Sequence, residues 1–103
     1  MTDPVTHVPV VAGAAYAEQI QRLPSKFTAT LRAEPDNRFN RQAVAVHASG
    51  GKIGYLPPEI SRRYFEPLKT SGAECPGRRA PHSSRENTGT EMLLDLTGVP
   101  CAD

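Results

Sequence analysis

A short polar segment, residues 36–42, contains the residue types that could bind a nucleic acid strand. It reads Asp-Asn-Arg-Phe-Asn-Arg-Gln, and Phe39 is its one aromatic residue, with Arg38 and Arg41 on either side. An exposed aromatic ring can stack on a base, and flanking cations can contact phosphates. Alternatively, Phe39 closes one end of a hydrophobic core and the arginines are ordinary solvated charges. The residue types alone leave both interpretations open.

Basic residues concentrate in the centre of the chain, although its net charge is only +1. From Arg22 to Lys69 there are nine lysines and arginines against four carboxylates, whereas from Glu86 onward there are four carboxylates and no base. A positive central face would attract a polyanion, but scattered solvated charge explains the same composition. Lys52, Arg62 and Arg63 are the residues that could extend such a face beyond the loop.

The sequence has none of the common spacings for catalysis or cofactor binding. His7, His47 and His82 lie far apart, and neither Cys75 nor Cys101 has a partner at a metal-binding interval. There is no P-loop, no dinucleotide fingerprint, no serine elbow and no carboxylate cluster that would hold Mg²⁺ for a nuclease. We therefore expect a protein that is not an enzyme and that uses no metal or cofactor. His47 should lie at the surface end of a strand. The cysteines should be free thiols, and a single disulfide between Cys75 and Cys101 is the alternative.

Turn residues and short apolar runs predict a mainly β protein. The ten prolines and eight glycines favour short strands and turns over long helices. A helix should begin at Pro57–Pro58, bury Ile60, Tyr64 and Leu68 on one face, and end or kink near residue 65 or 66 because of Pro67. A helical turn is expected at residues 18–23. Strands are predicted at residues 8–15 (with a bulge at Gly13), 27–32, 43–47, 52–56, 72–75 and 91–96, with a hairpin turn at 49–51.

The length and the order of the elements predict one small domain. A chain of 103 residues can bury one modest core, which we place at about residues 8–96 of a single domain spanning 1–103. Residues 1–7 are expected to be flexible, and the polar segment 76–89, rich in turn residues, is expected to be a mobile loop. Short strands with one main helix suggest a strongly bent antiparallel sheet or barrel. Because neither a signal peptide nor a run of about 18 apolar residues is visible, we expect a cytoplasmic protein without a membrane partner.

Three segments between Val10 and Leu68 form a fairly specific combination. They are VAGAAY, which ends at Tyr16; EPDNRFNRQAVAV, which begins at Glu34 and has the form EPxNxF…AVxV; and GKIGYLP, which begins at Gly51. Together they resemble the HIRAN domain, a small module at the N-terminus of helicase-like transcription factor and its relatives that also occurs alone or fused to other proteins in bacteria. The resemblance implies a mainly β (α+β) fold, a small OB-like or SH3-like antiparallel β-barrel with one or two short helices.

The best-known HIRAN domains bind single-stranded DNA and capture its 3′ end, and the resemblance implies roles for individual residues here. Tyr16 matches a tyrosine that stacks on a base, and Phe39 matches a tyrosine that packs on the terminal nucleotide. Asn37 matches an asparagine of the same loop, and Asn40 stands where an aspartate hydrogen-bonds the 3′-hydroxyl. Tyr55 stands where a histidine occurs, and its alternative role is a core residue.

Several positions depart from the family pattern. Ala15 stands in place of an arginine, Gln42 in place of an asparagine, and Pro58 in place of a lysine that contacts the strand. Phe39 lacks the phenol hydroxyl and Asn40 lacks the carboxylate charge, although its amide can still accept a hydrogen bond. The three rings that could stack are kept, whereas several polar contacts to a strand end are lost.

Two hypotheses follow from these residues. The first is a nucleic-acid-binding module whose expected ligand is single-stranded DNA, 3′ ends included, with a role in DNA repair or replication and a helicase or nuclease as a protein partner. The second is a protein-interaction or targeting module with a degenerate DNA site, suggested by the losses at Ala15, Asn40 and Pro58. For the first hypothesis the expected contact residues are Tyr16, Asn37, Arg38, Phe39, Asn40, Arg41, Lys52 and Tyr55.

Overall fold

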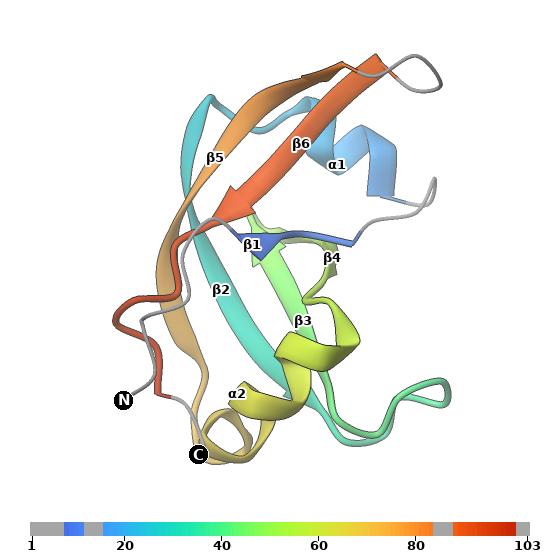
Figure 1. Cartoon of the computed structure of the whole chain (residues 1–103), viewed down its shortest axis with the longest axis vertical. Coiled ribbons are helices and arrows are strands. Elements are labelled where there is room, and N and C mark those ends of the chain that lie inside the picture. The colour runs from blue at the N-terminus through green and yellow to red at the C-terminus, as the bar shows by residue number, and fades with distance from the viewer. Residues whose placement is uncertain (1–7, 12–15, 84–87, 101–103) are drawn as a thin grey trace.

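The computed structural model describes residues 8–11, 16–83 and 88–100 and shows one curled antiparallel sheet with two short helices (Figure 1). The order of the strands across the sheet is β1-β6-β5-β2-β3-β4. Val11, just after the first strand, forms an isolated antiparallel bridge with Tyr55, so the two edge strands approach each other in a half-barrel. The predicted barrel-like, mainly β class is therefore confirmed. The elements are β1 (Val8–Pro9), α1 (Ala17–Gln21), β2 (Lys26–Glu34), β3 (Ala43–Ala48), β4 (Gly51–Tyr55), α2 (Pro58–Thr70), β5 (Ala73–Ser83) and β6 (Thr88–Leu94).

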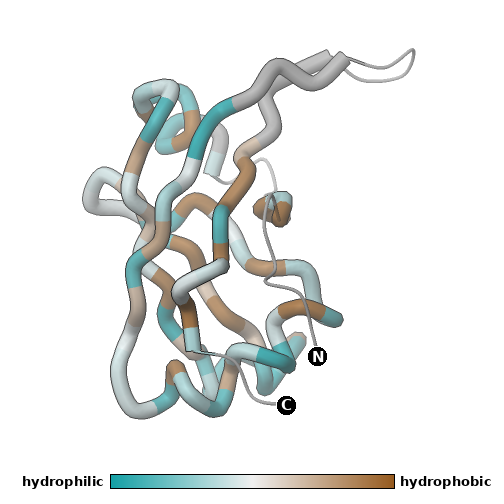
Figure 2. The backbone as a smooth tube through the Cα atoms, turned by 60° about the vertical axis from the view of Figure 1, so that its left-hand side comes forward, coloured by the Kyte–Doolittle hydropathy of each residue, from teal (hydrophilic) through white to brown (hydrophobic). Residues whose placement is uncertain are grey.

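The hydrophobic core fills the inside of the curled sheet, and α2 covers it. Leu31 on β2 pairs with Val46 on β3, and both side chains are fully buried. Tyr64 and Leu68 of α2 join the same core, and Ile60 packs against it, so the predicted apolar stripe of this helix is confirmed. Figure 2 shows brown and teal segments alternating along the tube, as elements with one face in the core require.

Helix α2 continues through Pro67 to Thr70, so the prediction that it ends near Phe65 or Glu66 is wrong. Proline cannot donate a helical hydrogen bond and therefore weakens the turn before it. Leu68, one residue later, has only 3% of its surface exposed. Burial of this side chain offsets the lost hydrogen bond and keeps the last turn helical.

Strand β5 extends over Ala73–Ser83 and pairs with both β2 and β6, so the prediction of a loop at 76–89 is wrong for residues 76–83. Pro76 suggested a break because it has no N–H, but its carbonyl still accepts a hydrogen bond from the Asp95 N–H at 3.0 Å. Two neighbouring strands hold this polar segment extended. Residues 84–87 lie outside the described part of the chain.

The remaining elements agree with the predictions in position but differ at their ends. The first strand is shorter than expected, and the proposed bulge at Gly13 lies outside the described residues. The hairpin turn between β3 and β4 has positive φ at Ser49 (53°) and Gly50 (84°), while Gly51 already belongs to β4. Cys75 is a buried free thiol, and burial together with Asp95 raises its pKa to about 11. Among the described residues no helix has the length and apolar character needed to cross a membrane.

Candidate nucleic-acid interface

A pocket of about 360 Å³ lies where the β2–β3 loop (residues 35–42) meets the end of β4 and the residues that precede α1 and α2. Three aromatic rings line this pocket together, those of Tyr16, Phe39 and Tyr55. All three were predicted as residues that could stack on bases, with a core role as the alternative for Phe39 and Tyr55. The two asparagines of the loop also line it. The complete set is Tyr16, Asn37, Phe39, Asn40, Tyr55, and the smaller or apolar Val11, Ala43, Leu56 and Pro58.

Tyr16 reaches this pocket because α1 is fixed to the β3–β4 turn. The Gln19 amide donates to the backbone carbonyls of Ala48 at 2.8 Å and Ser49 at 3.1 Å. Gly51 leaves the space that this side chain needs, because a Cβ there would lie 2.8 Å from Gln19 Cδ. With α1 held in this way, the Tyr16 ring stands edge-on to the Tyr55 ring, with 6.5 Å between the ring centroids.

Tyr55 is held by a hydrogen-bond network on the outer face of the sheet. The Lys52 ammonium donates to Glu34 Oε2 at 2.6 Å and to the Tyr55 hydroxyl oxygen at 3.0 Å. The Tyr55 hydroxyl donates in turn to Glu34 Oε1 at 3.0 Å. The strand register puts Ala43 opposite Glu34 and Ala45 opposite Tyr55, so only small side chains separate β2 from β4. These alanines let the carboxylate and the phenol meet across β3.

The network shifts the pKa values of its members. Burial acts to raise the pKa of Glu34, but hydrogen bonds from Lys52, Asn37 and Tyr55 outweigh it and lower the pKa. The same carboxylate raises the pKa of the Lys52 ammonium. The hydrogen bond from Lys52 acts to lower the pKa of Tyr55, but burial and the contacts with Glu34 and Tyr16 raise it overall. Near neutral pH the carboxylate and the ammonium therefore form a charged pair beside a neutral phenol.

The β2–β3 loop is shaped by its own asparagine side chains. Asn37 Oδ1 accepts hydrogen bonds from the backbone N–H groups of Phe39 at 2.9 Å and Asn40 at 3.0 Å. Asn40 Oδ1 accepts from the N–H of Gln42 at 2.9 Å. Such side-chain turns replace the backbone pairs that a loop lacks. The loop consequently presents Phe39 outward, and the side chain is 98% exposed. The alternative that Phe39 closes the core is therefore wrong.

The exposed apolar surface of the described residues concentrates at this pocket. Val11, at 53% exposure, and Phe39 are its two exposed large hydrophobic residues, and both line the pocket. Exposed apolar groups that gather at one hollow typically mark a binding site. Tyr55 is half-buried and belongs to the pocket wall, whereas Leu56 beside it joins the core.

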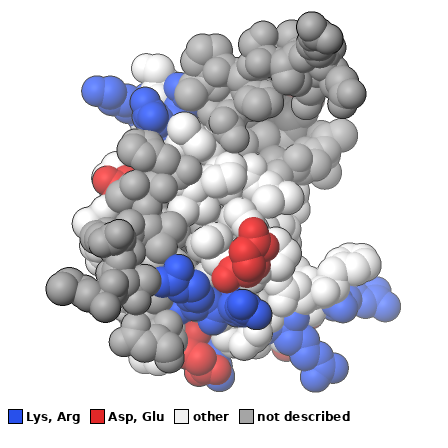
Figure 3. All heavy atoms as spheres, in the orientation of Figure 1, with Lys and Arg blue, Asp and Glu red and all other residues white. Residues whose placement is uncertain are grey.

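Basic side chains border the pocket on the loop side. Arg38 and Arg41 are exposed, and Figure 3 shows blue side chains at the lower right, where this loop lies in Figure 1. Lys52 was expected to extend the positive face, but its charge is balanced by Glu34. Arg62 and Arg63 lie on α2 and do not line the pocket.

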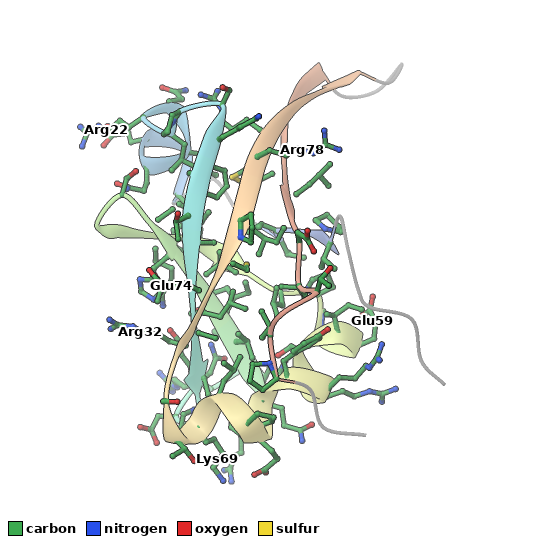
Figure 4. The ribbon with its side chains drawn as sticks, turned by 90° about the vertical axis from the view of Figure 1, so that its left-hand side faces the viewer. Arg22, Arg32, Glu59, Lys69, Glu74 and Arg78 are labelled. Atoms are coloured by element: carbon green, nitrogen blue, oxygen red, sulfur yellow. The ribbon has the colours of Figure 1, made fainter. Side chains whose placement is uncertain are left out.

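The outer face of the sheet beyond the pocket has charges of both signs. Figure 4 shows Arg32 of β2 and Glu74 of β5 on the same side of β2, pointing away from the core. His47 lies opposite Thr30 on this face, and burial, with the charges of Arg32 and Lys52, lowers its pKa. The positive character is therefore local to the loop and does not cover the whole face.

Gly54 allows the pocket wall to form. It has φ of +152°, and a Cβ there would lie 2.5 Å from the Val11 carbonyl oxygen. Val11 and Tyr55 exchange backbone hydrogen bonds of 2.8 and 2.9 Å directly beside it. A glycine at this position therefore lets the edge strands approach, which brings Val11 to the same pocket as Tyr55.

The structure brings together five of the eight predicted contact residues and leaves three at or beyond the rim. Tyr16, Asn37, Phe39, Asn40 and Tyr55 line one pocket, whereas the three cations Arg38, Arg41 and Lys52 do not. Sequence reasoning missed two further sets of residues that build the site: Val11, Leu56 and Ala43 in the wall, and Gln19 and Glu34 behind it. Among the described residues no three His, Cys, Asp or Glu side chains are grouped so as to hold a metal ion.

A second hollow of about 340 Å³ lies elsewhere, between β2, β5 and the end of β6. Phe27, Gly77 and Leu94 contribute to its wall, with Lys26 and Arg78 beside them. None of the residues predicted to contact nucleic acid lines this second hollow. It is therefore a control surface at which DNA binding is not expected.

Comparison with known families identifies one relationship. The family model described as HIRAN domain matches residues 6–97, which is most of the chain. Neither a curated protein nor a solved structure matches the chain significantly. HIRAN domains in general are nucleic-acid-binding modules, with DNA as the ligand.

Proposed function

Because the chain belongs to the HIRAN domain family, we propose that it binds single-stranded DNA in the pocket between Tyr16, Phe39 and Tyr55, and that it does so without catalysis. The observation that supports this most directly is the convergence of three rings from three separate segments on one hollow. Tyr16 precedes α1, Phe39 lies in the β2–β3 loop and Tyr55 ends β4.

The size and lining of the pocket favour an unstacked base over a duplex. A volume of about 360 Å³ is near the lower end of typical small-ligand sites, which span roughly 300–1,000 Å³. Apolar and aromatic walls bind the face of a base, and bases in a duplex have both faces covered by their neighbours. A single strand can place one base in the pocket and let Phe39 stack on the same or the next base.

The electrostatics of the loop fit the backbone of such a strand. Arg38 and Arg41 are exposed beside Phe39, where they can reach the phosphates on either side of a stacked base. Lys52 is less suited to this role because Glu34 holds it at 2.6 Å. We therefore assign the phosphate contacts to the two arginines. Lys52 instead holds the Tyr55 ring in position.

The experiment is fluorescence anisotropy with a labelled single-stranded oligonucleotide, its duplex and an RNA of the same sequence. Binding of the single strand at low salt and at least tenfold weaker binding of the duplex are expected. Two phosphate contacts predict that log K falls with log salt with a slope of about −1.4, and Arg38→Ala or Arg41→Ala should each reduce it by about 0.7. Absence of single-strand binding even at low salt would refute the proposal.

A second function is supported by the exposed apolar pair, since Val11 and Phe39 also suit contact with a protein. In that case Phe39→Ala would leave DNA affinity unchanged and abolish binding of a partner protein. Under the first proposal, the module would serve DNA repair or replication by bringing a helicase or nuclease partner to single-stranded DNA.

A further inference from the structure

A second surface lies at the hollow where β5 runs between β2 and β6. Side chains alternate between the two faces of a strand. Phe27 and Leu94 pack against the core, so their neighbours Lys26 and Leu93 point to the outer face. Arg78 lies between these two, because it pairs with Lys26 on one side and with Leu93 on the other. One row across three strands therefore presents two cations and an apolar side chain to the solvent.

The next row completes the hollow. Pro76 lies two residues before Arg78 and Asp95 lies two residues after Leu93, so both point to the same outer face. They are side by side, since the Asp95 N–H donates to the Pro76 carbonyl at 3.0 Å. The Asp95 carboxylate accepts hydrogen bonds from the N–H and hydroxyl of Thr97. The hollow thus has apolar side chains on its floor, two cations on β2 and β5, and one carboxylate after the end of β6.

The two cations of this hollow oppose each other. Like charges directly opposite on neighbouring strands destabilise a sheet. Lys26 and Arg78 are both exposed, and none of the described residues forms an ion pair with either. Glu74 is on the same face of β5, but it is four residues from Arg78, about 13 Å along the strand, and Figure 4 shows the two well apart. The free protein therefore holds an unfavourable positive pair beside an apolar hollow, and an anionic group of a partner would relieve it.

The other features of the hollow favour a peptide over a nucleic acid strand. Every nucleotide of a strand has a phosphate, which the Asp95 carboxylate would repel. A peptide is acidic only where its side chains are, and its backbone N–H groups can donate to a carboxylate. Pro76 and Leu93 are aliphatic, and the Phe27 ring packs against the core on the other face, so the residues that line the hollow offer a base no ring for stacking.

We propose that this face of β2, β5 and β6 is a docking surface for a partner protein, and that the partner supplies a segment in which an Asp or Glu lies within two residues of a large apolar residue. The carboxylate pairs with Lys26 and Arg78, and the apolar side chain covers Pro76 and Leu93. Arg78 and Pro76 are two residues apart on β5, which is also the spacing of same-face side chains in an extended peptide.

The docking surface is separate from the candidate DNA pocket. The two hollows have no lining residue in common. A volume of about 340 Å³ is near the lower end of typical small-ligand sites, roughly 300–1,000 Å³, and suits one side chain with its immediate neighbours. The inference therefore goes beyond the proposed function: the chain binds a partner protein on one surface while the other remains open to a DNA strand.

The test selects peptides from a phage-displayed random library on the immobilised full chain and measures their affinity by fluorescence anisotropy. Selected peptides should contain an acid within two residues of a large apolar residue. Lys26→Glu and Arg78→Glu should each weaken their binding at least about tenfold, because a hydrogen bond to a charged group is replaced by repulsion. Arg62→Glu is the matched control, since it makes the same charge change at an exposed residue of α2 that lines neither hollow. It should change the affinity by less than about twofold.

A second selection reverses the charges of the surface. On the double variant Lys26→Glu/Arg78→Glu, peptides with Lys or Arg in place of the acid should be enriched. The single variant Arg78→Glu converts a like-charge pair into an opposite pair, so its melting temperature should equal or exceed that of the wild type, which also shows that it is folded. A lower melting temperature would contradict the repulsion on which the inference stands.

The remaining outcomes are equally decisive. Enriched peptides without an acid, no enriched peptide at all, or affinities unchanged by Lys26→Glu and Arg78→Glu would overturn the docking surface. Displacement of the peptide by a saturating single-stranded oligonucleotide would also overturn it and would assign the surface to nucleic acid. DNA binding is tested separately on the same protein, where Phe39→Ala should weaken the oligonucleotide and leave the peptide affinity unchanged.

Discussion

Replacing Phe39 by alanine should weaken DNA binding and leave folding stability unchanged, because this ring is available to a ligand but is not packed in the core. The side chain is 98% exposed in the free protein, so its apolar surface is in water before and after folding. Its truncation therefore removes almost no buried area, and the free energy of unfolding should change by less than about 0.5 kcal/mol.

The expected loss of DNA affinity follows from stacking. Base–aromatic stacking contributes about 1–3 kcal/mol per base, which corresponds to roughly 5- to 150-fold weaker binding of a single strand. Phe39→Trp should retain most of the affinity, since it keeps an aromatic face. Phe65→Ala is the opposite control, because a ring that is 5% exposed stabilises the core and its loss should cost about 3–5 kcal/mol.

Chemical denaturation and fluorescence anisotropy on the same protein preparation measure both quantities. The reasoning would be refuted if Phe39→Ala unfolded as readily as a core variant, since the loop would then contribute to the fold. An unchanged DNA affinity would instead favour the protein-interaction function over the DNA-binding one.

Three further predictions concern the groups behind the pocket. Glu34→Gln should lower stability at neutral pH by up to about 1 kcal/mol, as expected for a partly exposed ion pair. Because folding lowers the pKa of Glu34, this difference should be fully present above the ordinary glutamate pKa and should disappear in denaturation experiments as the pH falls through the lowered pKa of the folded protein. Gly54→Ala places a Cβ 2.5 Å from the Val11 carbonyl oxygen, which is too close for two non-bonded atoms. The free energy of unfolding should fall by about 1–3 kcal/mol and the melting temperature by at least about 4 °C. A melting temperature equal to that of the wild type would contradict this geometry. The pKa of Cys75 is raised to about 11, so little of its thiol is ionised at pH 8 in the folded protein. In a variant whose other cysteine is replaced by serine, alkylation of Cys75 at pH 8 should be at least about a hundredfold slower in the folded protein than in denaturant. Equal rates would show that the thiol is accessible in the folded protein.

The elements that sequence reasoning predicted well are those whose own residues determine them. The spacing of Ile60, Tyr64 and Leu68 matches a helix, and burial of that face in α2 follows directly from it. The turn at Ser49 and Gly50 is similarly local, because glycine tolerates the positive φ that a tight hairpin needs.

The elements that it missed depend on partners distant in sequence. Pro76 and the polar residues after it predicted a loop, yet β2 and β6 provide backbone hydrogen bonds on both sides of this segment. Pro67 predicted a helix end, and the buried Leu68 keeps the helix intact. In both regions tertiary contacts outweigh a local preference.

The candidate site shows the same division. The loop around Phe39 was recognisable from its composition, whereas the roles of Tyr16 and Tyr55 came from the family resemblance. Glu34 was missed as the partner of Lys52, because the two are 18 residues apart and meet only when β2, β3 and β4 are in register. The one available signal was the opposite charge of Glu34 at the end of β2 and Lys52 in β4. The two side chains can meet only because β3, which lies between these strands, has alanines at the facing positions.

The most direct test of the proposed DNA site is a ¹H–¹⁵N NMR titration of the protein with a short single-stranded oligonucleotide. Binding in the pocket predicts that the largest chemical-shift changes fall on the amides of Tyr16, Asn37, Phe39, Asn40 and Tyr55. Changes confined to the hollow beside Phe27 and Gly77, or no changes at saturating oligonucleotide, would contradict the assignment of this pocket as the DNA site.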